Sequence, residues 1–323
     1  RLLPRRAMST GNTDWRKGSI RDSSGSFIIP WLKDMFPPPF SSVIKWWWNK
    51  SPPSFPTEQQ AKDWFPTIKP DWDAIKQKGS SITWLGHATC YLLMSNGLRV
   101  LTDPVFSQRA SPFQRAGPAR YVQIPCPISD IPTPHIVLIS HDHYDHLDID
   151  GINQLEASAT DIKPTYYVGL GLKNWFLDAF SGKISDDRIV ELDWWQKHKL
   201  SLQQGTTNPL SAEVEMVPAQ HWGSRNHFDA MTRLWGGYIV KDSSNKKFFF
   251  AGDTGFNEEM FAEIGKRHGP IDVAAIPIGA YEPRWFMHPQ HVDPAQAHQI
   301  HKLVKSKLSV GIHWGTFILT DEP

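Results

Sequence analysis

The chain has 323 residues, of which 40% are hydrophobic and 21% are charged, and this composition is typical of globular proteins rather than disordered or collagen-like ones. Its formal net charge is only +1, so no global field favours nucleic acid as a partner. Two cysteines, Cys90 and Cys126, are too few for a disulfide framework or a thiolate zinc site. No run of about 18 apolar residues predicts a helix that crosses a membrane.

Residues 1–78 differ in texture from the rest of the chain. Prolines recur through this segment and interrupt any sustained helical or alternating pattern. We expect an N-terminal extension that wraps around a domain formed by residues 79–323. Arg1, Arg5 and Arg6 are weakly typical of an organellar transit peptide, so an intracellular and organellar location is one expectation.

From residue 81 onward, short apolar runs alternate with turns. Residues 90–94 and 98–101 flank Asn96-Gly97, which is the strongest short signal for a β-hairpin. Further strands are expected at 82–85, 135–140, 165–168, 213–217, 236–240, 247–251, 273–276 and 309–312, and helices near 151–158, 170–180, 256–268 and 294–306. Many strands interleaved with few helices predict layered sheets covered by helices.

The residues that carry chemistry are concentrated at 141–146, where the sequence reads His-Asp-His-Tyr-Asp-His. This motif follows a predicted strand, at the point where α/β sheets place their ligands. The three imidazoles and the Asp145 carboxylate are costly to bury unless each finds a partner, and a metal serves all of them. In an extended loop, His141 and His143 point the same way and can share one ion. Asp145 and His146 then turn towards a second ion.

Three ligand-type residues repeat this placement later in the chain. His221, Asp253 and His313 each stand just after a predicted strand. A lone histidine such as His221 is more often a surface or core residue than a ligand, but the dense motif at 141–146 gives weight to all three. Imidazole and carboxylate ligands favour zinc, and ligand type alone leaves iron and manganese open. We therefore predict a site for two Zn²⁺ ions.

The motif at 141–146 is the H-x-H-x-D-H signature of the metallo-β-lactamase superfamily, which the chain resembles. Within that superfamily it is similar to the N-acylphosphatidylethanolamine-hydrolysing phospholipases D. The segments that carry this second likeness are residues 84–89, 102–106, 250–255, 277–287, 290–294 and 312–316. The resemblance implies an α+β fold, a four-layer αββα sandwich with the metals at one edge of the sheets.

Carried over position by position, the resemblance also implies a ligand set. The expected ligands are His141, His143 and His221 on one zinc, Asp145, His146 and His313 on the other, and Asp253 bridging the two. His87 is left between a place beside the ligands and a backbone partner. The other histidines, interpreted as non-ligands, include His198, His227, His268, His298 and His301.

The resemblance further implies a reaction. A hydroxide between the two ions would attack the phosphorus of N-acylphosphatidylethanolamine, releasing an N-acylethanolamine and leaving phosphatidic acid. Two ions about 3.5–4 Å apart lower the pKa of such a water and stabilise charge on the attacking and leaving oxygens. Asp142 and Asp253 are the candidate catalytic carboxylates for moving the proton, and the sequence leaves the choice open.

Five residues are candidates for contact with the substrate. Gln290 and His291 are expected around the metals, and Tyr144 lies inside the motif. Arg225 and Arg284 are candidates for the phosphate, because a guanidinium can hold two of its oxygens. A surface or structural ion pair is an equal alternative for either arginine.

An aromatic stretch within residues 28–55 has the composition of a membrane interface. Its rings are Trp31, Phe36, Phe40, Trp46, Trp47, Trp48 and Phe55, with Lys33, Lys45 and Lys50 beside them. Amphipathic rings flanked by lysines suit the headgroup region of a bilayer. The expected partners are thus an N-acylated phospholipid and a membrane surface, without nucleic acid and with a homodimer left open. The alternative is that these rings pack against the domain.

Two other functions compete with lipid hydrolysis. A hydrolase of the same fold could act on a lactone or on a nucleic-acid phosphodiester, although a nuclease would need a local basic groove that the sequence does not indicate. A non-catalytic membrane-binding scaffold would have lost its metal ligands, whereas all the expected ligands are present in this chain.

Overall fold

A computed structural model describes residues 12–32, 37–49, 56–159, 162–202, 210–226 and 228–322. The expectations for Arg1, Arg5, Arg6, Lys33, Phe36, Lys50, Phe55, His227 and the side chain of Phe40 lie outside the described residues. In the described part of the chain, no helix is both long enough and apolar enough to cross a membrane.

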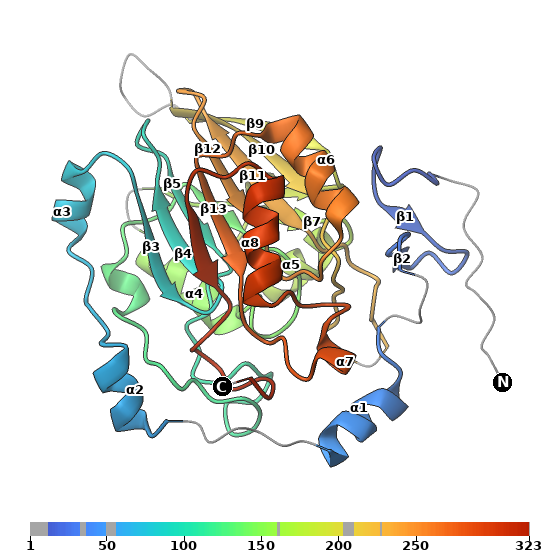
Figure 1. The fold of residues 1–323 in the computed structure, drawn as a ribbon. Coiled ribbons are helices and arrows are strands. Elements are labelled where there is room, and N and C mark those ends of the chain that lie inside the picture. The colour runs from blue at the N-terminus through green and yellow to red at the C-terminus, as the bar shows by residue number, and fades with distance from the viewer. Residues whose placement is uncertain are drawn as a thin grey trace.

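Two six-stranded sheets lie face to face at the centre of the molecule (Figure 1). The first contains, in spatial order, β3 (Ser81–Gly86), β4 (Thr89–Leu93), β5 (Arg99–Thr102), β6 (Ile136–Leu138), β7 (Thr165–Gly169) and β8 (Ile189–Leu192). The second contains β14 (Ser309–Ile312), β13 (Val273–Pro277), β12 (Lys247–Phe250), β11 (Gly237–Asp242), β10 (Leu210–Val217) and β9 (Lys197–Leu202). The predicted hairpin is confirmed, because β4 and β5 pair antiparallel across the Asn96-Gly97 turn.

The central strands of the first sheet, β5, β6 and β7, are buried on both faces. On β6, Ile136 and Leu138 belong to the core between the sheets, whereas Val137 belongs to the core on the outer side. Successive residues of a strand point to opposite faces, so a strand covered on both sides is apolar throughout. This explains the unbroken apolar run that precedes the histidine motif.

Helices cover the outer face of each sheet. Among these helices, α4 (Ile149–Ser158) and α5 (Lys173–Ala179) pack on the first sheet through Ile152 and Phe176, and α6 (Glu258–His268) and α8 (Pro294–Leu303) pack on the second through Ile264 and Ile300. Helix α8 begins as predicted, because the Asp293 side chain accepts a hydrogen bond from the Gln296 amide and Pro294 occupies the first turn. The predicted α+β sandwich, with helices outside two sheets, is confirmed.

The N-terminal extension contains regular elements that its prolines obscured. These are β1 (Ile20–Arg21), β2 (Phe27–Ile28), α1 (Phe40–Trp48), α2 (Glu58–Trp64) and α3 (Trp72–Gln77). The helices are too short for sustained periodicity, and two of them begin at local caps, where the Thr57 and Asp71 side chains accept backbone hydrogen bonds. Phe27 and Ile29 lie in the same core as the two sheets.

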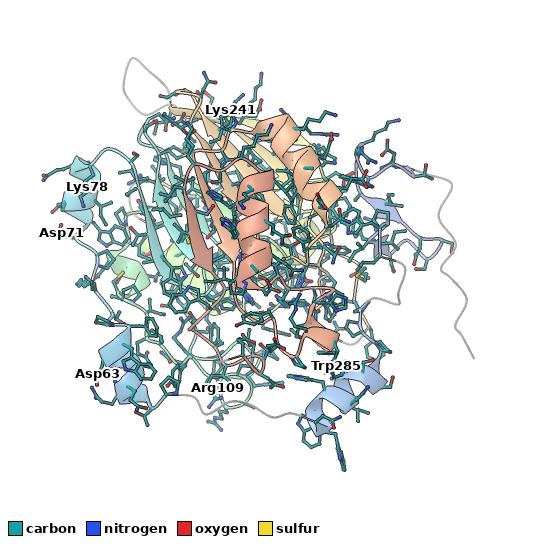
Figure 2. All side chains as sticks on the ribbon, viewed as in Figure 1. Asp63, Asp71, Lys78, Arg109, Lys241 and Trp285 are labelled. Atoms are coloured by element: carbon teal, nitrogen blue, oxygen red, sulfur yellow. The ribbon has the colours of Figure 1, made fainter. Side chains whose placement is uncertain are left out.

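Helix α1 docks on α7 (Arg284–Met287) through one side only. Trp46 stacks on Phe286 at 5.5 Å between ring centroids, and Lys45 Nζ lies 4.9 Å from the ring centroid of Trp285, which Figure 2 labels beside α1. Trp47 and Trp48 are 69% and 79% exposed. Some rings of the aromatic stretch therefore pack against the domain, and others face away from it.

Candidate metal centre

The predicted metal ligands lie just beyond strand ends in both sheets. Strand β6 of the first sheet runs into the loop 141–146. In the second sheet, β10 is followed by His221, β12 by Asp253 and β14 by His313. The side chains of these last three residues are at most 2% exposed. The structure thus assembles one buried cluster from segments far apart in sequence.

Three histidines converge in the first part of the cluster. His141 Nε2 lies 2.8 Å from His143 Nδ1, and His221 Nε2 lies 3.3 Å from the same nitrogen. A neutral imidazole offers one donor and one acceptor, so three ring nitrogens that face one another need shared protons or a cation. Such a set of imidazoles suits zinc.

A second group adjoins the first and shares a carboxylate with it. Asp145 Oδ2 lies 3.5 Å from His146 Nε2 and 3.6 Å from His313 Nε2. Asp253 Oδ2 lies 3.0 Å from each of the same two imidazole nitrogens. It is also 4.0 Å from His141 Nε2 in the first group. The Asp253 carboxylate is therefore placed between the two groups.

The donor set fits metal ions, because several of its buried atoms lack any other partner. Within the described ranges, Asp253 Oδ1, His146 Nε2 and both ring nitrogens of His313 form no hydrogen bond, although buried polar atoms nearly always do. The groups whose donor atoms all lie within 4.8 Å of one another are His87-Asp145-His146-His313, His141-His143-His221, His141-His146-Asp253 and His221-Asp253-His291.

The pKa values of the buried groups in the cluster are shifted in different directions. Burial holds the pKa of His141 and His221 well below the usual value. Burial also acts on His313, but nearby carboxylates, led by Asp253, outweigh it and raise the pKa of His313 to about 9. The pKa of the Asp253 carboxyl is well below its usual range, because His146 and His313 outweigh the effect of burial. The cluster is thus built to keep its carboxylates ionised.

We expect the metal-free protein to be most stable near pH 6.5. His313 has a folded pKa of about 9, above the ordinary value of about 6.5, so its contribution is complete below pH 6.5 and is lost as pH rises through about 9. Burial lowers the pKa of His87 to about 3, so the stability that depends on its neutral form is lost as pH falls below about 6.5. Thermal unfolding of the metal-free protein between about pH 5 and about pH 8 measures this. A midpoint that keeps rising above about pH 7 would contradict it.

Asp103 holds one of the predicted ligands, His146, in place, and this role was not predicted from the sequence. Its Oδ2 lies 2.6 Å from His146 Nδ1 and accepts a hydrogen bond from Ser140 Oγ at 2.6 Å. The Ser140 amide donates to the other carboxylate oxygen at 2.8 Å. Such partners fix the orientation of a ligating imidazole. The available signal was that Asp103 follows β5 just as Asp253 follows β12.

Three residues outside the predicted ligand set lie at the cluster: His87, whose role the sequence left open, and Gln290 and His291, which were expected around the metals. His87 Nε2 lies 3.0 Å from Asp145 Oδ2, which places it beside the ligands rather than on a backbone partner. His291 Nδ1 lies 4.0 Å from Asp253 Oδ2. The carbonyl oxygen of Gln290 lies 3.1 Å from His221 Nδ1. The described histidines outside these ligand groups include His198, His268, His298 and His301.

Tyr144 lies in the motif loop, and its hydroxyl is bonded to the backbone of Arg225. It donates to the carbonyl oxygen of Arg225 at 3.0 Å, and the Arg225 guanidinium lies 3.8 Å from the centre of the Tyr144 ring. Arg225 also donates to the carbonyl oxygens of Asp142 and Leu147. The structure therefore favours the structural alternative for Arg225.

Two other predicted site residues are not brought into the cluster. The Asp142 carboxylate is paired with Arg233, and it belongs to none of the ligand groups found among the described residues. Arg284 donates to the carbonyl oxygen of His291 at 3.0 Å and to the Gln296 side chain at 2.9 Å. Of the two alternatives left open for Arg284, these contacts favour the structural role.

A pocket of about 1190 Å³ opens beside the cluster, with His313 in its wall. It extends to the chain that follows α2, and the large apolar side chains in its lining include Trp64, Phe65, Ile68, Trp84, Trp314 and Leu319. The Trp314 ring stacks on Trp84 at 5.0 Å and meets Phe65 edge-on at 5.4 Å. Ile68 remains 77% exposed. The N-terminal extension therefore forms one wall of the pocket.

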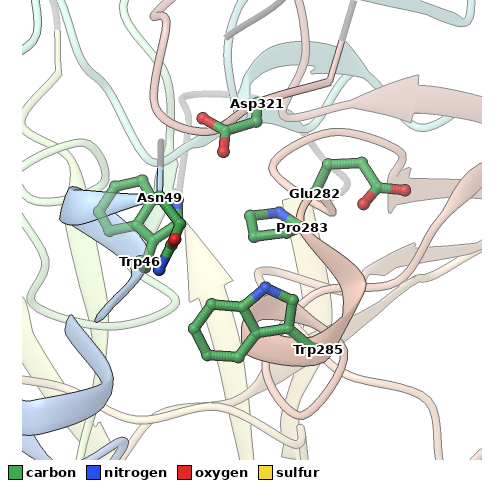
Figure 3. A pocket seen from close by; sticks show the side chains of 6 residues that line it. All are labelled: Trp46, Asn49, Glu282, Pro283, Trp285 and Asp321. Carbon is green, nitrogen blue, oxygen red and sulfur yellow. The ribbon is translucent and has the colours of Figure 1, made fainter. Parts of the chain in front are cut away.

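A smaller pocket of about 320 Å³ lies where α1 meets α7. Figure 3 shows its six lining residues, which are Trp46, Asn49, Glu282, Pro283, Trp285 and Asp321. None of these six belongs to a ligand group, so this pocket is separate from the metal centre.

Comparison with known proteins relates this fold and site to a family. Residues 98–314 match the family model described as "Beta-lactamase superfamily domain". The protein named "N-acyl-phosphatidylethanolamine-hydrolyzing phospholipase D 1" of Caenorhabditis elegans is 42% identical over 245 residues, which cover 76% of this chain and 66% of that protein. A mitochondrial protein of the same activity name from Saccharomyces cerevisiae is 35% identical over 241 residues, covering 74% of this chain and 48% of that protein. The chain thus spans less than two thirds of either relative.

A solved structure described as "a possible metal-dependent hydrolase", from Veillonella parvula, shares the fold. It is 17% identical, with a TM-score of 0.50, and the match covers 73% of this chain and 85% of that one. Two facing sheets, a histidine and aspartate cluster at their strand ends, and the match over residues 98–314 agree with one another. The chain belongs to the metallo-β-lactamase superfamily.

Proposed function

We propose that the protein is a zinc-dependent phosphodiesterase of the phospholipase D type, which hydrolyses N-acylphosphatidylethanolamine to an N-acylethanolamine and phosphatidic acid. The observation that carries this proposal is the Asp253 carboxylate between two groups of buried imidazoles, with Oδ2 3.0 Å from His313 Nε2 and 4.0 Å from His141 Nε2. The names of the worm and yeast relatives supply the substrate class.

Each group would hold one ion. The assigned ligands are His141, His143 and His221 for the first, Asp145, His146 and His313 for the second, and Asp253 for both. Two zinc ions bound there would supply Lewis acidity and a water of lowered pKa for attack on a phosphodiester. Asp103 orients His146 through the 2.6 Å contact to Nδ1, and the fixed ring keeps Nε2 directed at Asp253.

We assign the proton-handling role to Asp253 rather than Asp142. A proton acceptor must lie within hydrogen-bond reach of the reacting group, and Asp253 is the carboxylate placed between the two ligand groups. Asp142 is engaged with Arg233. His291 and Gln290, which line the same cluster, are proposed to contact the phosphate end of the substrate.

The pocket beside His313 would accept an acyl chain of the substrate. Its wall is rich in aromatic and aliphatic side chains, and apolar surface gains about 25 cal/mol for each Å² removed from water. The exposure of Ile68 at 77% is explained if a hydrocarbon chain covers it in the complex. The metal centre at His313 would then bind the phosphate end of the lipid, and the apolar wall would bind its acyl chain.

Introducing a charge into this wall should weaken binding of long-chain substrate. We expect Ile68→Asp to raise KM for a long-chain N-acylphosphatidylethanolamine about tenfold with little change in kcat, because burying a side chain of this size contributes about 1.5–3 kcal/mol and tenfold corresponds to about 1.4 kcal/mol. Steady-state kinetics in mixed micelles measures it. The matched control is Leu308→Asp, since Leu308 is 54% exposed and lies outside the pocket. Equal effects of both variants would contradict the proposed pocket.

We also propose that the exposed side of α1 contacts a membrane, so that the protein is peripheral to an intracellular membrane. Large apolar side chains rarely stand exposed together without a reason, and Ile44, Trp47 and Trp48 are 46%, 69% and 79% exposed on this helix. We expect the double variant Trp47→Ser and Trp48→Ser to lower the fraction that floats with phosphatidylcholine vesicles several-fold. Ordinary flotation of this variant would show that another surface makes the contact.

The reaction itself is tested with purified protein and defined substrates. Zinc-loaded protein should release N-acylethanolamine from N-acylphosphatidylethanolamine in mixed micelles, and treatment with a chelator should abolish the release until zinc is restored. Turnover of a lactone or of a nucleic-acid phosphodiester in its place would keep the fold assignment and overturn the substrate. Zinc content well below one ion per chain after reconstitution would favour the non-catalytic scaffold.

A further inference from the structure

The N-terminal extension reaches the metal centre through one side chain, Trp31. Its indole Nε1 donates a hydrogen bond to Gln220 Oε1 at 2.8 Å. Gln220 immediately precedes His221 and is 4% exposed. A residue 189 positions away in sequence is therefore bonded to the neighbour of a proposed metal ligand.

Gln220 joins Trp31 to two other loops of the site. Its side-chain Nε2 donates to the carbonyl oxygen of Pro289 at 2.9 Å, and its backbone N–H donates to Thr254 Oγ1 at 3.0 Å. Pro289 precedes Gln290, and Thr254 follows Asp253. The Gln220 side chain and backbone thus connect the segments that carry His221, Asp253 and Gln290.

The Gln220 side chain is closely packed against Gly255, which restricts its position. An added Cβ on Gly255 would lie 2.4 Å from Gln220 Nε2 and 2.5 Å from the Pro289 carbonyl oxygen. The backbones of Gln220 and Gly255 also pair, with the Gly255 amide donating to the Gln220 carbonyl at 2.8 Å. The Trp31 indole supplies the remaining hydrogen bond of the Gln220 side chain described here.

The ring of Trp31 is held by other tryptophans. Trp31 stacks on Trp194 at 6.0 Å and meets Trp15 edge-on at 5.3 Å. Trp194 Nε1 donates to the carbonyl oxygen of Trp235, whose own Nε1 donates to the carbonyl oxygen of Ala219 at 2.9 Å. Two indole N–H groups therefore fix consecutive residues, Ala219 and Gln220, directly before His221.

We infer that Trp31 is a positioning residue for the metal centre, which acts by holding Gln220 and through it the loop that carries His221. Groups that hydrogen-bond to a metal-ligating side chain commonly change metal affinity 10–100-fold when they are lost, so for Trp31, one contact further out, we expect an effect at the lower end of that range. The inference rests on the proposed metal site but adds a role for the N-terminal extension in it. Trp31 itself is assigned no contact with substrate.

The experiment compares two variants that each remove one indole hydrogen bond between the extension and the domain. Trp31→Phe keeps an aromatic ring but loses the bond to Gln220. Trp195→Phe loses the bond that Trp195 Nε1 donates to the Trp15 carbonyl at 2.7 Å, and it removes none of the Gln220 hydrogen bonds. Both variants are loaded with zinc, and the rate of zinc release to a coloured chelator is measured. The absorption spectrum of the cobalt-loaded form reports ligand geometry.

We expect Trp31→Phe to release zinc about tenfold faster than the parent and to alter the cobalt spectrum, while Trp195→Phe matches the parent in both. Gln220→Met removes the acceptor of the Trp31 bond together with the bond to Pro289, so it should release zinc at least as fast as Trp31→Phe, and it replaces that variant if Trp31→Phe does not fold. Unchanged release by Trp31→Phe, or equal changes in both tryptophan variants, would overturn the inference. A parent protein that takes up no zinc would instead overturn the proposed function.

Discussion

Asp253→Asn is expected to lower kcat/KM for the phosphodiester at least about a thousandfold and to reduce bound zinc. The substitution removes the negative charge that lies 3.0 Å from both His146 Nε2 and His313 Nε2. Metal ions contribute several kcal/mol to stabilising such a transition state, and about 1.4 kcal/mol corresponds to each factor of ten in rate. Metal content and steady-state kinetics on the same preparation measure the two effects together.

The control is Asp142→Asn, because Asp142 is also buried and lies in the motif but pairs with Arg233. We expect it to retain its zinc and to lose much less activity than Asp253→Asn, since its carboxylate supports the loop rather than the reaction. A metal-replete Asp142 variant as inactive as the Asp253 variant would move the proton-handling role to Asp142.

Gly279→Ala is expected to weaken the proposed metal site by displacing the backbone that carries His313. An added Cβ would lie 2.0 Å from the carbonyl oxygen of His313 and 3.0 Å from Trp314 Cα. Both are backbone atoms next to a proposed ligand, so the strand end that presents His313 must move. Overpacking of this kind costs about 1–3 kcal/mol, and we expect zinc affinity to fall by at least about tenfold with it.

Gly265→Ala separates these two effects. Its added Cβ would lie 1.9 Å from the carbonyl oxygen of Leu303, a comparable clash that occurs between α6 and α8. Thermal unfolding should show similar losses for the two variants, whereas titration with zinc should show weakened binding for Gly279→Ala alone. Equal zinc affinities in two folded variants would mean that Gly279 matters for packing only.

The double-sheet fold and the place of the histidine and aspartate cluster could be predicted from local sequence features. Apolar runs marked most strands, and ligand-type residues directly after them marked the site, because a chain that leaves a buried strand emerges at its end. Strands β8 and β9 were missed, since Lys197–Leu202 has exposed lysines and lies at a sheet edge. Each pairs with the strand next to it in the chain, β8 with β7 and β9 with β10, so polar residues at a sheet edge rather than sequence distance hid them.

The supporting contacts were predictable to a smaller degree. Asp103 and Arg233 reach the motif from remote segments, and only the folded chain shows that one holds His146 and the other pairs with Asp142. Charge and residue type made Arg284 a reasonable candidate for phosphate, but its hydrogen bonds to backbone and to Gln296 are decided by tertiary packing. The short helices of the extension likewise depend on capping residues rather than on long amphipathic repeats.

The proposed ligands come from both layers of the sandwich, with loop 141–146 attached to the first sheet and His221, Asp253 and His313 to the second. Two metal ions bound by all of these residues would connect the first sheet to the second. Cys90 and Cys126 are buried and free, so no disulfide among the described residues serves that purpose. Metal binding to the folded form adds to its stability. Zinc supply would therefore affect the stability of the two-sheet fold as well as the rate of the proposed reaction.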